Sequence, residues 1–363
     1  MGVVLLALGV LATALAIPIF TAGPNFGYDF AFYYAAANRL AAGSPLYPAA
    51  ALAGPFVHGI VEIYAYAPVF AVLVLPLTTL PAHVAAAAWL VIDLTATVAA
   101  CALMPVAKTT RAAVLGISLL SFASLVNLNL GSVNGLLLLG LVLAWRLADR
   151  PLGGLATALS IAVRPALGLV PVGWALQRRP AAVGWAIVAG LALVAITVPV
   201  AGFGAWTDWL AVLANDRFAG SPHNGSVLGV LAAAGAGPTL QAIGSALALA
   251  GALAALWRSR RRDDGVVLAV AVSGSLLASP LLWDHYLLLL AVPAAVMADR
   301  GRAWGLALPL LSWLPWPVYP IVALLGTLGP LTTPAGGGSG RKRLDHGDPI
   351  TDLGGARLDR TDR

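Results

Sequence analysis

Long runs of apolar residues, separated by short polar stretches, extend through most of the chain. A helix needs about 20 mainly apolar residues to cross the hydrocarbon core of a membrane. Seven runs meet or approach this length: 2–20, 82–104, 112–129, 182–200, 239–257, 265–281 and 303–327. Five others are shorter or interrupted by proline: 66–80, 135–148, 152–163, 165–177 and 286–298. The pattern predicts an all-α, polytopic membrane protein with about ten to twelve transmembrane helices.

Two segments depart from this pattern and are expected to lie outside the hydrocarbon. The loop 21–65 contains an amphipathic stretch, Asp29–Ala42, which is suited to a short helix at the membrane surface. The tail 331–363 is rich in glycine and alternates arginine with aspartate, so it has too few apolar residues to pack and is expected to be disordered. We therefore expect one membrane domain, residues 1–330. Its first run has no preceding Lys or Arg and is interpreted as an uncleaved helix.

Composition narrows the class of protein further. Hydrophobic residues make up 60% of the chain and charged residues only 10%, whereas soluble proteins carry about 25% charged residues. A water-soluble enzyme is therefore excluded. The single cysteine, Cys101, excludes a disulfide framework, a zinc ribbon and an iron–sulfur protein. The net charge of +6 is spread over short basic clusters between apolar runs, which indicates membrane loops and no nucleic-acid partner.

The basic clusters also predict the orientation of the chain in the membrane. By the positive-inside rule, the loops that carry them are cytoplasmic: Arg146, Arg150, Arg178, Arg179, Arg258, Arg260, Arg261, Arg262, Arg300 and Arg302. Tracing the chain between these loops places several polar segments at the external face: 131–134, Arg164, 201–226 and 279–285. Lys108 and Arg111 would also fall outside unless 66–104 crosses an odd number of times. We expect the run 66–80 to be a half-crossing.

Acidic side chains are costly near a membrane unless they are solvated or paired. Only six non-terminal acids lie outside the basic loops: Asp29, Glu62, Asp93, Asp208, Asp216 and Asp284. Asp29 begins a short aromatic-rich stretch after the first helix. It is either the N-cap of a surface helix or a general base that faces a cavity.

Arg164 lies between two apolar half-helices, each too short to span a membrane, and directly before Pro165. An unpaired arginine that faces lipid costs about 2.5–3.5 kcal/mol. Either Arg164 extends to the external headgroups, or it faces a cavity at the helix break and binds an anion such as phosphate.

Other polar residues are predicted at the same face. Trp283, Asp284 and His285 are consecutive at a helix junction, where they suit a lipid headgroup or simply cap the next helix. The amides of Asn134 and Asn224 suit sugar hydroxyls but equally suit bonds between helices. Metal-ligand spacing and nucleotide-binding motifs are not recognisable, so we expect no metal and no cofactor, and a nucleotide sugar is disfavoured as donor.

Taken in order, these motifs resemble glycosyltransferase family 87 of the GT-C superfamily, which includes polyprenyl-phosphate-mannose-dependent α-mannosyltransferases of actinobacteria. The resemblance extends over residues 25–300. It rests on Asp29, Tyr33-Tyr34, Gly43, Tyr47, Tyr66-Ala-Pro68, Leu75-Pro-Leu77, Gly131-Ser-Val-Asn134, Val163-Arg-Pro165, Asn224-Gly-Ser226, Ser279-Pro280 and Trp283-Asp-His285.

The resemblance implies a helix bundle with an external active site and transfer of a sugar, with inversion, from a polyprenyl phosphate to a hydroxyl of a glycolipid or glycan. It implies that Asp29 is the general base and that Arg164 and His285 bind the donor phosphate. We assign six further residues to substrate binding: Tyr33, Tyr34, Asn134, Asn224, Trp283 and Asp284.

Two positions depart from the pattern of the family. Ser132 replaces a glutamine that is common there, and Tyr286 follows His285 where the histidine is often doubled. These departures bear on the identity of the sugar and acceptor. The main alternative function is a polyprenyl-linked lipid transporter or flippase, because broken helices with a buried arginine also describe anion sites in transporters. Transporters often have two halves of matching hydropathy, and this chain shows no such duplication.

Overall fold

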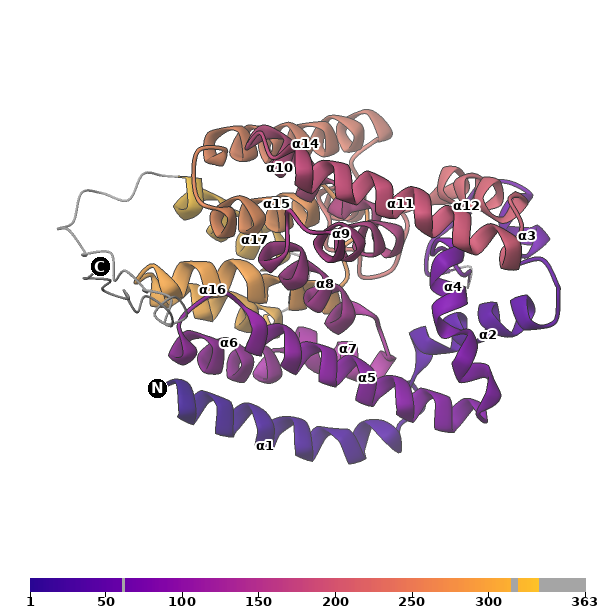
Figure 1. Ribbon diagram of the computed structural model, residues 1–363, viewed down its shortest axis with the longest axis horizontal. Helices are drawn as coiled ribbons and strands as arrows, with labels where there is room; N and C mark the ends of the chain where they lie inside the picture. Colours follow the sequence, from indigo (N-terminus) through magenta and orange to yellow (C-terminus); the bar gives the residue numbers. More distant parts are fainter. Residues whose placement is uncertain (61–62, 315–318, 333–363) are drawn as a thin grey trace, which may run out of the picture. The chain divides into compact units, whose positions relative to one another are not determined.

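The computed structural model describes residues 1–60, 63–314 and 319–332, and these residues are mainly helical (Figure 1). The first half contains α1 (Gly2–Thr21), α2 (Tyr28–Ala41), α3 (Ala49–Leu52), β1 (Phe56–Val57), α4 (Pro68–Val74), η1 (Leu75–Thr79), α5 (Ala82–Leu103), α6 (Lys108–Leu120), α7 (Phe122–Leu130), α8 (Asn134–Arg146), α9 (Pro151–Val163), η2 (Pro165–Gly168) and α10 (Leu169–Leu176). The second half contains α11 (Pro180–Ala201), α12 (Gly204–Asn215), β2 (Asp216–Arg217), α13 (Val227–Ala233), α14 (Pro238–Ser259), α15 (Asp264–Ala278), η3 (Asp284–Leu290), α16 (Ala291–Asp299), η4 (Ala303–Trp313) and α17 (Tyr319–Thr332).

Four helices of the described chain, α1, α5, α11 and α14, are long and apolar enough to cross a membrane. A fifth span is formed if α6 and α7 are taken together across a bend of 63°. The bend lies at Ser121, whose side chain accepts a hydrogen bond from the Ser124 amide and so caps the second helix. Large apolar side chains on α1 and α11 are exposed, as lipid-facing helices require. The predicted fold class, an all-α polytopic membrane protein, is confirmed.

The remaining apolar helices are shorter and better buried. α8 and α9 have 13 residues each and α15 has 15, and every residue of α15 from Gly265 to Leu277 is buried. Their length explains why fewer spans satisfy a length criterion than the ten to twelve that the sequence predicts.

Ion pairs and hydrogen bonds hold one of these ends together, and we call it the basic end. Arg179 bridges Asp149 and Asp264, and Arg300 pairs with Asp263. The backbone amide of Ala107 donates to a carboxylate oxygen of Asp299 at 2.9 Å, and Arg146 donates to the Leu103 carbonyl at 2.8 Å. The predicted cytoplasmic loops therefore meet at one end, and the loop with Lys108 and Arg111 is among them.

The opposite end, which we call the site end, carries the long first loop and most of the short elements. Here α2, α3, α4 and α12 lie together (Figure 1). The run 66–80 forms α4 and η1, which contact α2, and the Ala67 amide donates to the Ala162 carbonyl at the end of α9. The run therefore lies at the site end, and its half-crossing of the membrane stays a prediction. The chain then crosses once, in α5, which brings Lys108 to the basic end.

The short interior helices begin well below the site end of α5. The Gly135 amide at the start of α8 donates to Asp93 at 2.9 Å. Asp93 stands eleven positions after the first residue of α5, which corresponds to about 16 Å along the helix axis. The floor of the site end is therefore recessed between longer outer helices.

A two-stranded parallel pairing joins distant loops at the site end. β1 pairs with β2, with Phe56 opposite Asp216 and Val57 opposite Arg217. These four residues are the described exception to the helical prediction. The stretch predicted to form a surface helix is helical, as α2, and its place at the membrane surface stays a prediction. Residues 333–363, nearly all of the predicted tail, lie outside the described residues.

Candidate functional site

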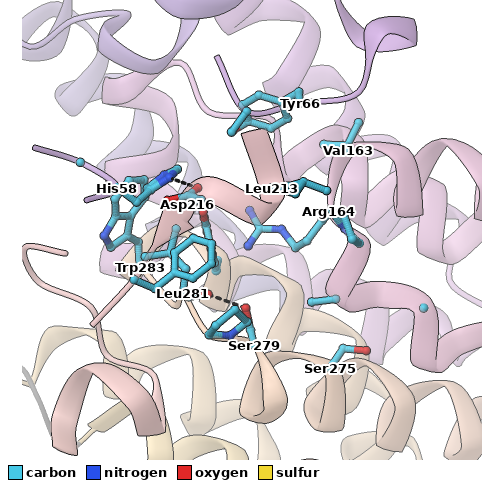
Figure 2. Close-up of a pocket in the computed structure, with 18 of the residues that line it drawn as sticks. His58, Tyr66, Val163, Arg164, Leu213, Asp216, Ser275, Ser279, Leu281 and Trp283 are labelled. Atoms are coloured by element: carbon cyan, nitrogen blue, oxygen red, sulfur yellow. Dashed lines mark hydrogen bonds and ion pairs between the residues drawn. The ribbon is translucent and has the colours of Figure 1, made fainter. Parts of the chain in front are cut away.

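A cavity of about 550 Å³ opens at the site end, where α2, the break between α9 and η2, β2 and the segment 278–286 converge (Figure 2). Its walls carry Asp29, Tyr33, His58, Arg164, Asp216 and Trp283 among mostly apolar residues. Elements that are far apart in the sequence thus place acidic, basic and aromatic side chains around one space.

Asp29 is the second residue of α2 and lines the cavity. Gly27 adopts a left-handed conformation with φ 73°, and its amide donates to the Asn129 carbonyl at 2.8 Å, which fixes the start of the helix. Ser132 donates a hydrogen bond to Asp29. Burial raises the pKa of Asp29 to about 6, although Ser132, Arg164 and His58 act in the opposite direction. A carboxyl group of that pKa can serve as a general base near neutral pH.

His285 lies beside Asp29 at the start of η3. Its Nε2 atom is 3.7 Å from Oδ2 of Asp29, which is a close polar contact rather than a hydrogen bond. Burial and the positive charge of Arg164 lower the pKa of His285 to about 3. The imidazole is therefore neutral at pH 7 and can donate a hydrogen bond from one ring nitrogen.

Arg164 ends α9 directly before Pro165 and is only 8% exposed. Its guanidinium carbon lies 3.1 Å from the centroid of the Tyr286 ring, and its Nη2 donates to Oδ1 of Asn134 at 3.3 Å. Among the described residues, its Nε has no hydrogen-bond partner. Figure 2 shows the guanidinium reaching into the cavity. Of the two interpretations of the sequence, the cavity-facing one agrees with this placement.

A chain of buried polar groups supports Arg164 from behind. Oδ1 of Asn127 accepts hydrogen bonds from both the amide and the side chain of Asn134, while its Nδ2 donates to Asp93 at 2.5 Å. Asp93 also accepts from the Gly135 amide. The side-chain amide of Asn134 is thereby oriented with its Oδ1 atom toward Arg164. Asn134, predicted to bind substrate, lies behind the arginine rather than among the residues that line the cavity.

Comparison with known proteins shows the family of the chain. The model of Glycosyltransferase family 87 matches residues 64–280. The chain belongs to glycosyltransferase family 87. It is therefore a membrane transferase of the GT-C class that acts on a sugar donor and an acceptor. Comparisons with curated proteins and with solved structures give no match.

The family 87 match covers only part of the cavity. Arg164 and Asp216 lie inside the matched residues, whereas Asp29 and His285 lie outside them. The fold brings them together: Asp29 of α2 lines the same cavity as Arg164, and His285 contacts Asp29 from η3, which contributes Tyr286 to the cavity wall.

The two departures from the family pattern lie next to these groups. Ser132 is the residue that donates to Asp29, so a short hydroxyl stands directly against the carboxylate. Tyr286 is the residue whose ring covers Arg164. Both substitutions therefore alter the immediate surroundings of charged groups in the cavity of this family 87 protein.

The other predicted site residues divide into two groups. Tyr33 and Trp283 line the cavity, and the hydroxyl of Tyr33 lies 3.1 Å from that of Tyr66. Tyr34 is directed elsewhere, because its hydroxyl donates to the Leu80 carbonyl at 2.8 Å. Asn224 and Asp284 are also absent from the cavity wall.

Asn224 joins two loops instead. Its Nδ2 donates to the carbonyls of Phe218 and Pro280, and its Oδ1 accepts from the amides of Ser226 and Leu282. With all these bonds formed, the side chain holds the segment 279–283 against the loop after β2. Its contribution to the cavity is therefore one of position.

Asp284 precedes His285 but does not line the cavity. Burial raises its pKa, and the nearby His223 acts against that increase. Glu62, considered among the acids of the sequence, lies outside the described residues.

His58 was not predicted as a site residue, although it lines the cavity and pairs with Asp216 at 2.7 Å. The two residues are 158 positions apart, so no local motif links them. Within the described residues, no group of three or more His, Cys, Asp or Glu side chains is arranged to hold a metal ion.

Proposed function

We propose that this family 87 glycosyltransferase moves a sugar, mannose by resemblance, from a polyprenyl phosphate to a hydroxyl of a glycolipid or glycan. The observation that carries the proposal is the meeting of three groups at one cavity, where two of them line the wall and the third contacts Asp29 from beside it. These are a buried carboxylate with a pKa of about 6, a neutral histidine 3.7 Å from it, and an arginine with an unpartnered Nε.

The proposed reaction is a single displacement with inversion. The oxygen of the acceptor hydroxyl forms a bond to the anomeric carbon while Asp29 accepts the proton of that hydroxyl. The bond between that carbon and the phosphate oxygen breaks, and the polyprenyl phosphate leaves with the electron pair. Arg164 and a hydrogen bond from His285 stabilise the charge on the departing phosphate. One carboxylate base is sufficient, because no glycosyl-enzyme intermediate is formed.

The apolar part of the cavity wall supports a lipid-linked donor. It includes Leu169 and Val172 of α10, Leu249 of α14 and Ala278 of α15. These apolar side chains are suited to contact the first isoprene units of a polyprenyl chain. The recessed floor of the site end places Arg164 at a depth that a lipid phosphate can reach.

The orientation of the enzyme follows from its charge distribution. The basic end is proposed to be cytoplasmic, and the cavity, at the opposite end, is proposed to open on the extracytoplasmic side of the plasma membrane. Residues 1–330 are proposed to form the transferase domain, with 331–363 as a tail that does not take part in transfer.

The test is transfer of labelled mannose from polyprenyl-phosphomannose to lipids in membranes that contain the wild-type protein or Asp29→Asn. We expect a labelled product with wild type and at least a 100-fold lower rate with the variant, because general-base catalysis contributes about 10²–10⁴-fold. Asp208→Asn, which changes an acid outside the cavity, is the matched control and should retain activity.

Two results would contradict the proposal. Retained transfer by Asp29→Asn would remove Asp29 from the role of base. Movement of polyprenyl phosphates across the membrane without a new glycosidic bond, in membranes with proven acceptor lipids, would favour the transporter or flippase. If a product forms only from a different polyprenyl-phosphate sugar, mannose is replaced by that sugar in the proposal and the proposed mechanism is unchanged.

A further inference from the structure

A second acid–histidine pair faces the same cavity and is not used by the proposed displacement. Nδ1 of His58 lies 2.7 Å from Oδ2 of Asp216, and both residues line the cavity (Figure 2). The side chain of Asp216 is 1% exposed and that of His58 is 18% exposed. The carboxylate is therefore enclosed, while the imidazole remains accessible.

The pairing leaves one nitrogen of the imidazole available. A carboxylate at Nδ1 favours the tautomer with the proton on that nitrogen, so Nε2 carries a lone pair and can accept a hydrogen bond. No hydrogen bond to Nε2 occurs among the described residues, and the buried Oδ1 of Asp216 has no partner there either. Buried polar groups are normally satisfied, and a pair that serves only the fold has no need of an open acceptor.

Two aromatic rings lie close to the imidazole of His58. The ring centroids of Trp283 and Phe218 lie 5.1 Å and 5.6 Å from that of His58. Trp283 is held in place by a hydrogen bond from its Nε1 to the Pro222 carbonyl at 3.0 Å. Gly59, with φ 78°, permits this close packing, because a Cβ atom there would lie 3.3 Å from the Trp283 ring.

We propose that His58, Asp216 and Trp283 form a sugar-binding subsite, in which Nε2 of His58 accepts a hydrogen bond from a sugar hydroxyl. A fixed aromatic face beside an oriented acceptor matches a pyranose, which presents apolar C–H groups next to hydroxyl groups. The subsite rests on the proposed function in one respect, namely that the cavity binds a glycosylated substrate. The sugar comes either from the donor or from the acceptor.

The experiment compares wild type with His58→Ala and with Asp216→Asn, each in lipid nanodiscs. Asp216→Asn preserves the size of the side chain, but its amide can donate to Nδ1 and so place the imidazole proton on Nε2. His83→Ala, at an exposed position outside the cavity, is the matched control. Thermal unfolding in nanodiscs identifies any variant that fails to fold, in which case the remaining variant decides.

Two readouts are measured on each protein. Saturation-transfer difference NMR with methyl α-mannoside and other methyl glycosides detects sugar binding without the reaction. Steady-state kinetics gives KM for donor and acceptor separately. We expect the NMR signal to be lost in both variants and KM for one substrate to rise about tenfold, with kcat within about threefold of wild type. The substrate whose KM rises is the source of the sugar.

Unchanged glycoside binding and unchanged KM values in the folded variants would overturn the subsite. A fall in kcat with both KM values unchanged would also overturn it, because His58 would then act on the chemistry. Binding that depends on His58 in a protein that transfers no sugar would support the subsite and refute the proposed reaction. Sugar transfer at the wild-type rate and KM in His58→Ala would refute the subsite and support the proposed reaction.

Discussion

At the scale of single residues, the surroundings of Asp29 set the pH at which it can act as a base. Burial raises its pKa to about 6, while the hydrogen bond from Ser132 and the charge of Arg164 limit the increase. A base must be ionised before it can accept a proton. We therefore expect kcat/KM for transfer to rise as the pH rises through about 6 and to level off above it.

Ser132→Ala tests the cause of this pKa. The hydroxyl donates to the ionised carboxylate, which favours the charged form, so its removal raises the pKa of Asp29. The acid limb of kcat/KM should move to higher pH, with little change on the plateau. Ser118→Ala, which alters a buried serine outside the cavity, is the control. An unmoved limb would show that Ser132 does not set the proton affinity of Asp29.

Asp29→Asn should be at least as stable as the wild type at pH 7. The pKa of Asp29 is about 6 in the folded protein and near 3.8 in an unfolded chain, so folding favours the protonated form between these values. Stability therefore falls as the pH rises through that window, and a neutral amide avoids the loss. Thermal unfolding should show a higher midpoint for the variant at pH 7 and no difference near pH 4. A lower midpoint at pH 7 would contradict this reasoning.

The sequence predicted the charged residues of the cavity better than its neutral ones. Asp29 and Arg164, which line the cavity, and His285, which contacts Asp29, were identified because a charge or an imidazole beside apolar helices is costly and needs an explanation. Tyr33 and Tyr34 could not be separated, because adjacent positions on a helix point about 100° apart and only the fold shows which faces the cavity. His58 was missed because its partner lies in another loop.

At the scale of helices and strands, the site depends on a break in one helix and a network that joins three others. The side chain of Arg164 lies at the cavity because α9 ends directly before it, at the break formed by Pro165. Behind it, Asp93 of α5 bonds to Asn127 of α7 and to the first amides of α8. The position of Arg164 therefore depends on side chains that do not line the cavity.

Asp93→Ala should weaken transfer without touching the cavity. Its removal leaves the Asn127 side chain and two backbone amides without their acceptor, so Asn134 loses its fixed orientation toward Arg164. We expect kcat/KM to fall about 10- to 100-fold, with an unchanged acid limb because Asp29 keeps its partners. The matched control is Thr97→Ala, one turn further along α5, whose hydroxyl bonds only within its own helix. Activity equal to that of the control would refute a positioning role for Asp93.

At the scale of the whole bundle, the two ends differ in the groups that they carry. The arginine–aspartate ion pairs lie at the basic end, whereas the cavity and most of the short elements lie at the site end. The sequence predicted this division from its basic clusters. It could not settle the path of 66–104, because an apolar run of 15 residues has the composition of a membrane segment whether or not it crosses. The contacts of α4 and η1 with α2 show that the run lies at the same end of the bundle as that helix.

Single-cysteine labelling tests this path and the proposed orientation together. Cys101 is buried and is the only cysteine, so new ones can be read against a low background. Thr79→Cys in η1 and Lys108→Cys at the start of α6 are both at exposed positions on either side of α5. A membrane-impermeant maleimide should label Thr79→Cys in intact cells and Lys108→Cys only after permeabilisation.

The pattern of labelling separates two errors that activity measurements would not. If both cysteines are labelled in intact cells, 66–104 does not cross an odd number of times and the ends are wrongly assigned. If only Lys108→Cys is labelled, the path is right but the orientation is inverted, and the cavity opens to the cytoplasm. Ser44→Cys in the first loop and Arg261→Cys before α15 should then invert in the same way, because each shares an end with one of the first pair. Only agreement of all four positions with the positive-inside prediction supports an extracytoplasmic donor.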